Sequence, residues 1–336
     1  MTTGLAERRK GAALRLLMIA GALAVTAAVT LGITARSSRP DLASGPVVPG
    51  LSTTIAGAQR ITVTSAQASY RIERTERGWA MRDRGDYPVL GGRLAQLTEG
   101  LEALRYTRRM TNDASKHERL GVDDPRQGGR GVLVQIEDGR GAFLVNLILG
   151  VETGGLYVRR PDDDQTWAAA GELPPLRDVA AWLDLSPLDI PVEQLARIEI
   201  TPAEGPPYVL ARSGASAPFA LVSPAREPLA QSVLDATAAQ LTQITPRDVQ
   251  PAPAIQGPPR ARLRALTFDG VAIEAELIDG ANGDWLKLVA RAGRPEQEEA
   301  ALAFNNRAAA WAYALSPSDA DRLTPPLSVL LPRPPP

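Results

Sequence analysis

Few residues in this sequence have the types and spacing that catalysis or metal binding requires. His117 is the only histidine, and there is no cysteine. Neither a histidine-based nor a cysteine-based zinc site can therefore be completed. We expect His117, in Lys116-His-Glu before Leu120, to be a solvent-exposed residue at a helix end, with a role as general base as the alternative. A catalytic triad would depend on this one histidine, and Ser186-Pro187 and Ser316-Pro317 lack the surroundings of a nucleophilic serine.

Two acidic clusters could suggest a cation site. Asp162-Asp163-Asp164 is followed by Gln165-Thr-Trp, which returns to a strand. A calcium loop would instead have ligands at alternating positions and a glutamate downstream. We expect a solvated turn there, and a second turn at Asp123-Asp124-Pro125. Gly91-Gly92 precedes a helix, but it matches neither of the phosphate-binding patterns G-x-x-x-x-G-K and G-x-G-x-x-G.

The sequence therefore predicts no catalytic residue, no cofactor-binding residue, no metal ligand and no cofactor. A hydrolase with two carboxylates far apart in the sequence stays open as the least favoured interpretation. Five tryptophans could form a carbohydrate-binding platform: Trp79, Trp167, Trp182, Trp285 and Trp311. Trp182 and Trp311 occupy matching positions in a repeat described below, which favours core packing for that pair. The other three are open.

The longest apolar stretch of the chain is residues 16–35, which carry no charge and lie between Arg15 and Arg36. Twenty helical residues span about 30 Å, the thickness of a bilayer core. Four basic residues precede the stretch and two follow it, which favours a cytoplasmic N-terminus, residues 1–15. We predict a single-pass protein of the bacterial inner membrane with the bulk of the chain in the periplasm. The alternative is a cleaved signal peptide, whose apolar region is usually shorter.

Small residues recur at every fourth position of this segment, at Ala20, Ala24, Ala28 and Gly32. Faces of this kind let membrane helices approach one another closely. They predict a packing face for a second transmembrane helix. The alternative is that alanine, abundant in this chain, falls there by chance.

The composition of the chain limits the number of cores it can form and the partners it can bind. The chain has 336 residues, of which 44% are hydrophobic, and it can bury one large core or two modest ones. Its net charge of −1 gives no overall field that would attract nucleic acid. We expect no nucleic-acid partner.

The chain after the apolar stretch divides into a linker at 36–58, a first unit at 59–190, a second unit at 191–323 and a Pro-rich tail at 324–336. Alternation predicts strands near residues 60–64, 70–74 and 79–81. Leucines at 94, 97, 101 and 104 predict a helix. Arg105, Arg108 and Arg109 are expected at its end. Asp138-Gly139 predicts a hairpin, and a further helix is expected from Pro175 to about Trp182.

The second unit repeats the first in order. Ile198-Glu-Ile-Thr repeats Ile61-Thr-Val-Thr, and Tyr208-Val-Leu-Ala-Arg repeats Tyr70-Arg-Ile-Glu-Arg. Further matches pair Phe219 with Trp79, Asp269-Gly270 with Asp138-Gly139, and Ala310-Trp311 with Ala181-Trp182. The sequence predicts an α+β fold: two tandem, duplicated units with mainly antiparallel sheets. Two prolines stiffen the junction, and we predict an inter-unit seam at Pro187, Leu188, Pro191 and Glu193.

The chain resembles a known family, domain of unknown function 4340, through Leu120-Gly-Val-Asp-Asp-Pro125, Ile148-Leu-Gly150, Tyr157-Val-Arg-Arg160 and the stretch from Trp182 to Ile190. The likeness covers roughly residues 60–320. It implies an envelope protein associated with ABC transporters of the gliding-motility type, and it supplies no active-site residue.

Three functions follow as expectations. The first is a non-enzymatic accessory or scaffold protein, with an ABC-transporter permease or a related periplasmic subunit as its partner. The second is an anchored binding module for an envelope polymer or lipid, with the cleft between the units as its site. The third is the hydrolase described above.

Overall fold

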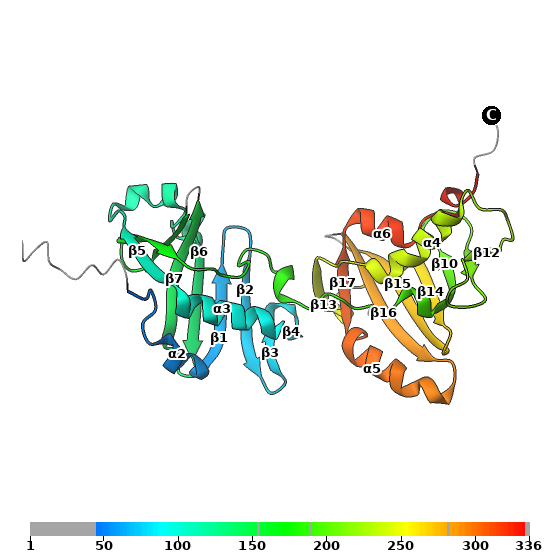
Figure 1. The fold of residues 1–336 in the computed structure, drawn as a ribbon, viewed down its shortest axis with the longest axis horizontal. Helices are drawn as coiled ribbons and strands as arrows, with labels where there is room; N and C mark the ends of the chain where they lie inside the picture. Colours follow the sequence, from blue (N-terminus) through cyan, green and yellow to red (C-terminus); the bar gives the residue numbers. More distant parts are fainter. Residues whose placement is uncertain (1–44, 153–154, 189, 281–282, 333–336) are drawn as a thin grey trace, which may run out of the picture.

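The computed structural model describes residues 45–152, 155–188, 190–280 and 283–332, which form two lobes arranged end to end (Figure 1). The predicted transmembrane segment 16–35, with its packing face at Ala20, Ala24, Ala28 and Gly32, lies outside these residues. Within them, no helix combines the length and the hydrophobicity that crossing a bilayer demands.

The first lobe is built on an antiparallel sheet of nine strands. In spatial order the strands are β4 (Tyr87–Pro88), β3 (Gly78–Met81), β2 (Ser69–Thr75), β1 (Ala58–Thr64), β6 (Val132–Asp138), β7 (Phe143–Glu152), β8 (Gly155–Arg159), β9 (Thr166–Ala170) and β5 (Arg105–Arg109). The predicted hairpin at Asp138-Gly139 is confirmed. The Asp138 carboxylate accepts hydrogen bonds from the backbone N–H groups of Arg140 and Ala142, at 2.8 and 2.9 Å. These bonds lower the pKa of Asp138.

The second lobe is built on an antiparallel sheet of eight strands. In spatial order they are β12 (Ala220–Ser223), β11 (Tyr208–Ala211), β10 (Leu195–Thr201), β14 (Pro259–Thr267), β15 (Val271–Gly280), β16 (Gly283–Ala292), β17 (Trp311–Leu315) and β13 (Asp248–Pro251). These eight take the places of β3, β2, β1, β6, β7, β8, β9 and β5. The protein is therefore an α+β protein with two antiparallel sheets, and the two sheets have the same strand order.

One helix lies across a face of each sheet: α3 (Gly91–Ala103) in the first lobe and α4 (Gln231–Gln240) in the second (Figure 1). The predicted leucine face is confirmed, because Leu97, Leu101 and Leu104 are fully buried. The arginines expected at the helix end instead belong to strand β5, which pairs with β9. Leu104 ends α3 with an extended backbone, so the chain turns directly into that strand.

A tyrosine anchors the last segment of each lobe to its sheet. The hydroxyl of Tyr70 in β2 donates to the carbonyl oxygen of Leu176 at 2.9 Å. The hydroxyl of Tyr208 in β11 donates to the carbonyl oxygen of Pro325 at 2.8 Å. Burial raises the pKa of both phenols, so each stays a protonated donor at neutral pH. The sequence match between these tyrosines thus corresponds to one shared tertiary contact.

In each lobe a basic side chain holds a loop over the face of the sheet opposite to α3 or α4; Arg159 is buried and Lys287 is partly buried. Arg159 in β8 donates from Nε to the carbonyl oxygen of Val122 at 3.1 Å. Lys287 in β16 donates to the carbonyl oxygen of Ile255 at 2.6 Å. Gly150 lets the first loop approach closely, since a Cβ atom there would lie 2.2 Å from the Leu120 oxygen. The two loops share no sequence pattern, so only the structure shows that they are equivalent.

The packed part of the chain extends beyond two predicted boundaries. Part of the predicted linker 36–58 packs on the first lobe, where Val47 and Leu51 are buried. The backbone N–H of Val47 donates to the carbonyl oxygen of Leu104 at 2.9 Å. In the predicted tail 324–336, Leu327 and Leu330 are buried in the second lobe. Apolar residues in both segments therefore join the core.

Two other expectations are wrong. The helix predicted from Pro175 to Trp182 is a mostly irregular segment with one short 3-10 turn at Ala180–Trp182. Trp182 and Trp311 are not equivalent. Trp311 begins β17, which corresponds to β9, whereas Trp182 lies beyond β9 in the 3-10 turn. The shared Leu-Ser-Pro sequence made the two appear aligned.

The second lobe contains two helices for which the first lobe shows no counterpart among its described residues: α5 (Glu298–Ala308) and α6 (Pro317–Leu323). Helix α5 lies between β16 and β17. Its Asn305 side chain accepts from the backbone N–H of Ala290 and donates to the Ala290 carbonyl oxygen, both at 2.8 Å. These bonds satisfy the backbone N–H and C=O groups of Ala290, which lies beyond the part of β16 that pairs with β17. The short helix α2 (Leu51–Thr54) belongs to the first lobe.

Candidate functional site

The two lobes meet where the β3–β4 edge of the first sheet faces the β13–β17 edge of the second (Figure 1). Arg84 Nε lies 2.6 Å from Asp248 Oδ1 in an ion pair that is partly shielded from water. The ring of Tyr87 packs edge-on against Trp311, with centroids 4.9 Å apart. Gly85 brings the backbone close, because a Cβ atom there would lie 2.3 Å from Pro251 Cγ. Polar and aromatic contacts together hold the two lobes in one orientation relative to each other.

A cleft of about 540 Å³ lies beside this contact, and both lobes contribute to its walls. Its aromatic residues are Trp79, Tyr87 and Trp311. Arg77 comes from the first lobe and Arg307 from the second. Clefts between domains that combine aromatic surface with a few polar groups are typical ligand sites.

A hydrogen bond joins two of the segments that line the cleft. The Tyr87 hydroxyl donates to the carbonyl oxygen of Asp184 at 2.5 Å. Burial raises the pKa of Tyr87, so it remains a donor. Asp86, with a φ of 66°, is the one non-glycine residue with positive φ in the described parts of the chain. Its carboxylate pairs with Arg82 at 2.7 Å.

The predicted seam residues fall in two groups. Pro187 is buried and lines the cleft. Leu188 packs against the main core, while Pro191 and Glu193 are exposed on the segment that leads into β10. Trp79 and Trp311 belong to the five tryptophans considered as a carbohydrate-binding platform, whereas no sequence pattern indicated Tyr87.

His117 is not at a solvent-exposed helix end, and that expectation is wrong. Its side chain is 5% exposed, and its Nε2 lies 2.9 Å from the carbonyl oxygen of Asp164. Because a carbonyl can only accept, Nε2 carries the proton. The histidine thus joins the 114–120 turns to the Asp162–Asp164 turn, whose side chains are exposed as predicted.

Two carboxylates lie close to the Nε atom of one arginine in the second lobe. Arg260 Nε lies 2.9 Å from Asp284 and 3.0 Å from Asp279. Burial raises the pKa of Asp284, against the opposing effect of Arg260. Neither carboxylate lines the cleft. Across residues 45–332, leaving aside the gaps, no three histidine or acidic side chains gather in a way that could hold a metal ion.

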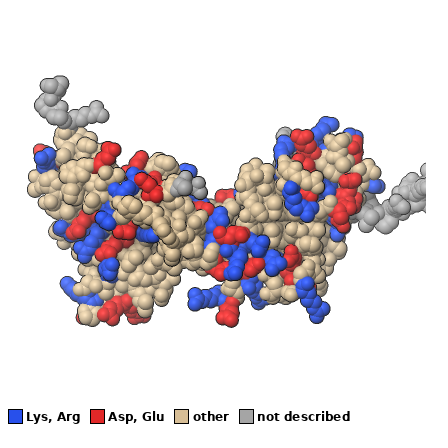
Figure 2. Space-filling view, turned by 180° about the vertical axis from the view of Figure 1, so that it is seen from behind, with Lys and Arg blue, Asp and Glu red and all other residues tan. Residues whose placement is uncertain are grey.

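A second hollow, on the open face of the second sheet, is lined by alternating charges. Arg264 pairs with Glu199, and Arg291 pairs with Glu274. Basic and acidic side chains are likewise interspersed over the face shown in Figure 2, and neither sign forms a continuous field. Mixed charges of this kind favour a solvated surface.

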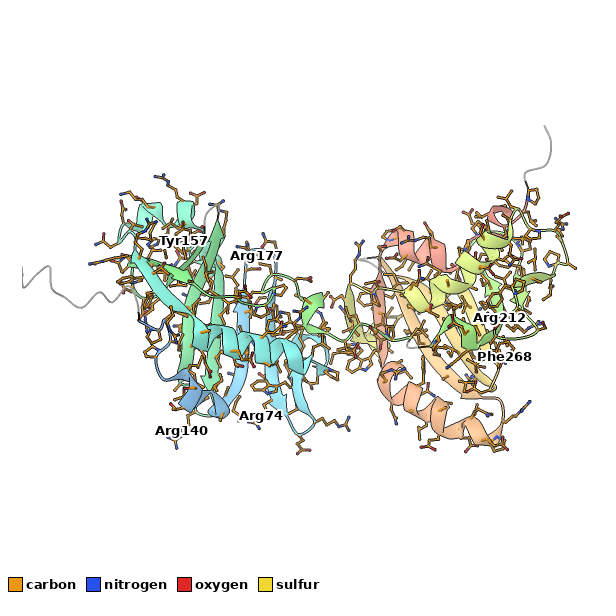
Figure 3. The ribbon with its side chains drawn as sticks, in the orientation of Figure 1. Arg74, Arg140, Tyr157, Arg177, Arg212 and Phe268 are labelled. Atoms are coloured by element: carbon orange, nitrogen blue, oxygen red, sulfur yellow. The ribbon has the colours of Figure 1, made fainter. Side chains whose placement is uncertain are left out.

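At the far end of the second lobe, the Arg212 guanidinium lies 5.7 Å from the centre of the Phe268 ring (Figure 3).

The fold and the cleft define a two-lobed α+β protein with a ligand-sized cleft where its lobes meet. The family described as Domain of unknown function (DUF4340) matches residues 79–260, more than half of the chain. The chain belongs to this family. The match begins in β3 and ends at the start of β14, so it crosses from one lobe into the other. Comparisons with curated proteins and with solved structures gave no match.

Proposed function

We propose that this protein is a membrane-anchored accessory or scaffold protein of an envelope complex of the ABC-transporter type, and that it acts by binding other proteins. The anchor is the uncharged segment 16–35, which places both lobes on the periplasmic side of a bacterial inner membrane. The transporter association comes from the family resemblance. We also infer that the two lobes arose by duplication, and their shared strand order supports this.

The observation that supports the scaffold role is the fixed contact between the lobes. The Arg84–Asp248 ion pair and the Tyr87–Trp311 ring contact join the two sheets at their edges. Two lobes held in one orientation present a long, preorganised surface, and preorganisation lowers the entropic cost of binding a partner.

Cross-linking in intact cells tests this function. The full chain with a C-terminal tag is cross-linked with formaldehyde, purified under denaturing conditions and analysed by mass spectrometry. The matched control is residues 1–58 fused to an unrelated soluble domain. We expect transporter membrane subunits to be enriched with the full chain over the control. Recovery of envelope polymer without protein partners would refute the scaffold role.

A second candidate function is binding of an envelope polymer or lipid in the cleft. The specific observation in its favour is the presence of Trp79 and Trp311 on opposite lobes at one cavity of about 540 Å³. Tryptophan rings stack on sugar rings and on apolar chains. Soluble envelope glycan should change the tryptophan fluorescence of the full chain, and the Trp79→Ala variant should lose that change while Trp285→Phe keeps it.

A further inference from the structure

The first lobe has an apolar groove of about 460 Å³ on the side of the sheet covered by α3. Val132, Leu149 and Leu156 of strands β6, β7 and β8 form its floor. Leu173 and Pro174, from the segment after β9, form its wall. Leu156 and Leu173 are partly exposed, so apolar surface faces water here.

The register of the strands identifies the same place in the second lobe. In the first sheet Leu149 pairs with Val132 on one side and with Val158 on the other. In the second sheet Leu277 pairs with Ala261 and with Leu286 in the same way. By this register Asp284 at the start of β16 occupies the position of Leu156 in β8.

Helix α6 covers this place in the second lobe. Its Asp321 lies 3.5 Å from Arg260, which is itself paired with Asp284 at 2.9 Å. On the inner side of the helix, Ala320 and Leu323 are almost completely buried. The side chain of Ser316 caps the helix by accepting from the backbone N–H of Asp319 at 3.0 Å.

The first lobe lacks such a helix because its connection is shorter. Helix α6 intervenes between Leu315 at the end of β17 and Pro325, which accepts the Tyr208 hydrogen bond. In the first lobe a short non-helical segment joins Ala170 at the end of β9 to Leu176, which accepts the Tyr70 bond. Gly100 lets that segment pack directly on α3, since a Cβ atom there would lie 2.3 Å from the Glu172 oxygen.

We infer that this groove binds a short amphipathic helix of a partner protein, seated as α6 is seated in the second lobe. This inference rests on the proposed scaffold function and names its contact surface. The partner helix carries apolar residues at positions i and i+3, as Ala320 and Leu323 do. Leu156 has the position in the first lobe that Asp284 has in the second. The residue of the partner helix that contacts Leu156 is therefore expected to be apolar. Arg177, labelled in Figure 3, and Asp178 both lie at the groove, so the outer side of the partner helix is expected to carry polar residues.

Site-specific photo-cross-linking in native membranes tests this inference on the full chain. A p-benzoylphenylalanine replaces Leu173, and two control chains carry it in place of Phe143 or Leu302, which are 51% and 60% exposed. We expect the Leu173 position to give a protein adduct whose cross-linked peptide has apolar residues at helical spacing. Two blocking variants accompany it. Leu156→Asp introduces the charge found in the second lobe, and a graft replaces residues 171–175 with residues 316–324.

The outcomes separate this inference from the scaffold function. Loss of the adduct by at least tenfold in Leu156→Asp or in the graft supports the groove. An adduct with lipid, with residues 1–44 of the same chain or with a second copy overturns it. Adducts at Phe143 or Leu302 without one at Leu173 overturn the groove and leave the scaffold function standing. No protein adduct at any of the three positions contradicts both.

Discussion

Replacement of Arg159 by methionine should destabilise the first lobe strongly. The side chain is 6% exposed. Besides Val122, its guanidinium reaches the carbonyl oxygens of Arg160, Pro161 and Asp163 at 3.1, 3.2 and 3.3 Å. A hydrogen bond from a charged donor contributes about 1.5–3 kcal/mol. The buried bond to Val122 counts fully, and water can replace the other three in part, so we expect a loss of ~3–4 kcal/mol. For a lobe of this size that corresponds to a fall in Tm of about 10 °C.

The matched control is Lys287→Met, the equivalent change in the second lobe. Lys287 makes one such bond and is only partly buried, so its loss should cost ~1–2 kcal/mol. Hydrogen exchange followed by mass spectrometry measures the stability of each lobe separately. Thermal unfolding followed by circular dichroism measures the change in Tm. Arg159→Met should speed exchange over residues 120–131, with little change in the second lobe. An effect of Arg159→Met no larger than that of Lys287→Met would refute the reasoning.

Three further predictions concern single contacts. Tyr70→Phe and Tyr208→Phe each remove a buried hydroxyl donor and should lower the free energy of unfolding by about 1 kcal/mol in urea titrations, to a similar extent in both lobes. Asn305→Ala leaves both backbone groups of its strand partner unpaired and should cost about 1–3 kcal/mol, with faster amide exchange in β16. The guanidinium of Arg126 lowers the pKa of Asp124 below its unfolded value. Its stabilising effect is therefore present at neutral pH and is lost as the pH falls through the lowered pKa. The wild type and Asp124→Asn should differ at pH 7 and converge in acid.

Local sequence patterns predicted those parts of the fold whose hydrophobic period is regular. The leucine face at 94–104 and the Asp138 hairpin are confirmed because helix and turn geometry depends on nearby residues. The strands that contain Ile61 and Ile198 bury one face against the core and leave the other more exposed, which produces their alternating pattern. Comparison of the two halves of the sequence also predicted a repeat, and eight strands follow the same order in both sheets.

The errors arose where tertiary contacts decide the structure. A short run such as Arg105–Arg109 has no period of its own, and it becomes a strand because β9 offers an edge. The buried position of His117 depends on a carbonyl 47 residues away in the chain. The equivalence of the two loops held by Arg159 and Lys287 involves different residue types, so no sequence comparison could find it.

The candidate sites were predictable only in part. Pro187 was expected at the junction between the units and lines the cleft. Trp79 and Trp311 both line the cleft because two sheet edges approach each other, and no local sequence pattern predicts that approach. The groove of the first lobe becomes visible only by comparison with α6, because Val132, Leu149 and Leu173 look like ordinary core residues in the sequence.

The most direct test of the central claim is the mass of the complex that the full chain forms in its own membrane. The tagged protein is solubilised in mild detergent, purified without cross-linking and analysed by native mass spectrometry. We predict an assembly in which this chain is present in a fixed ratio with at least one integral membrane protein. A chain recovered mainly as a monomer, at detergent concentrations that leave other membrane complexes intact, would contradict the account.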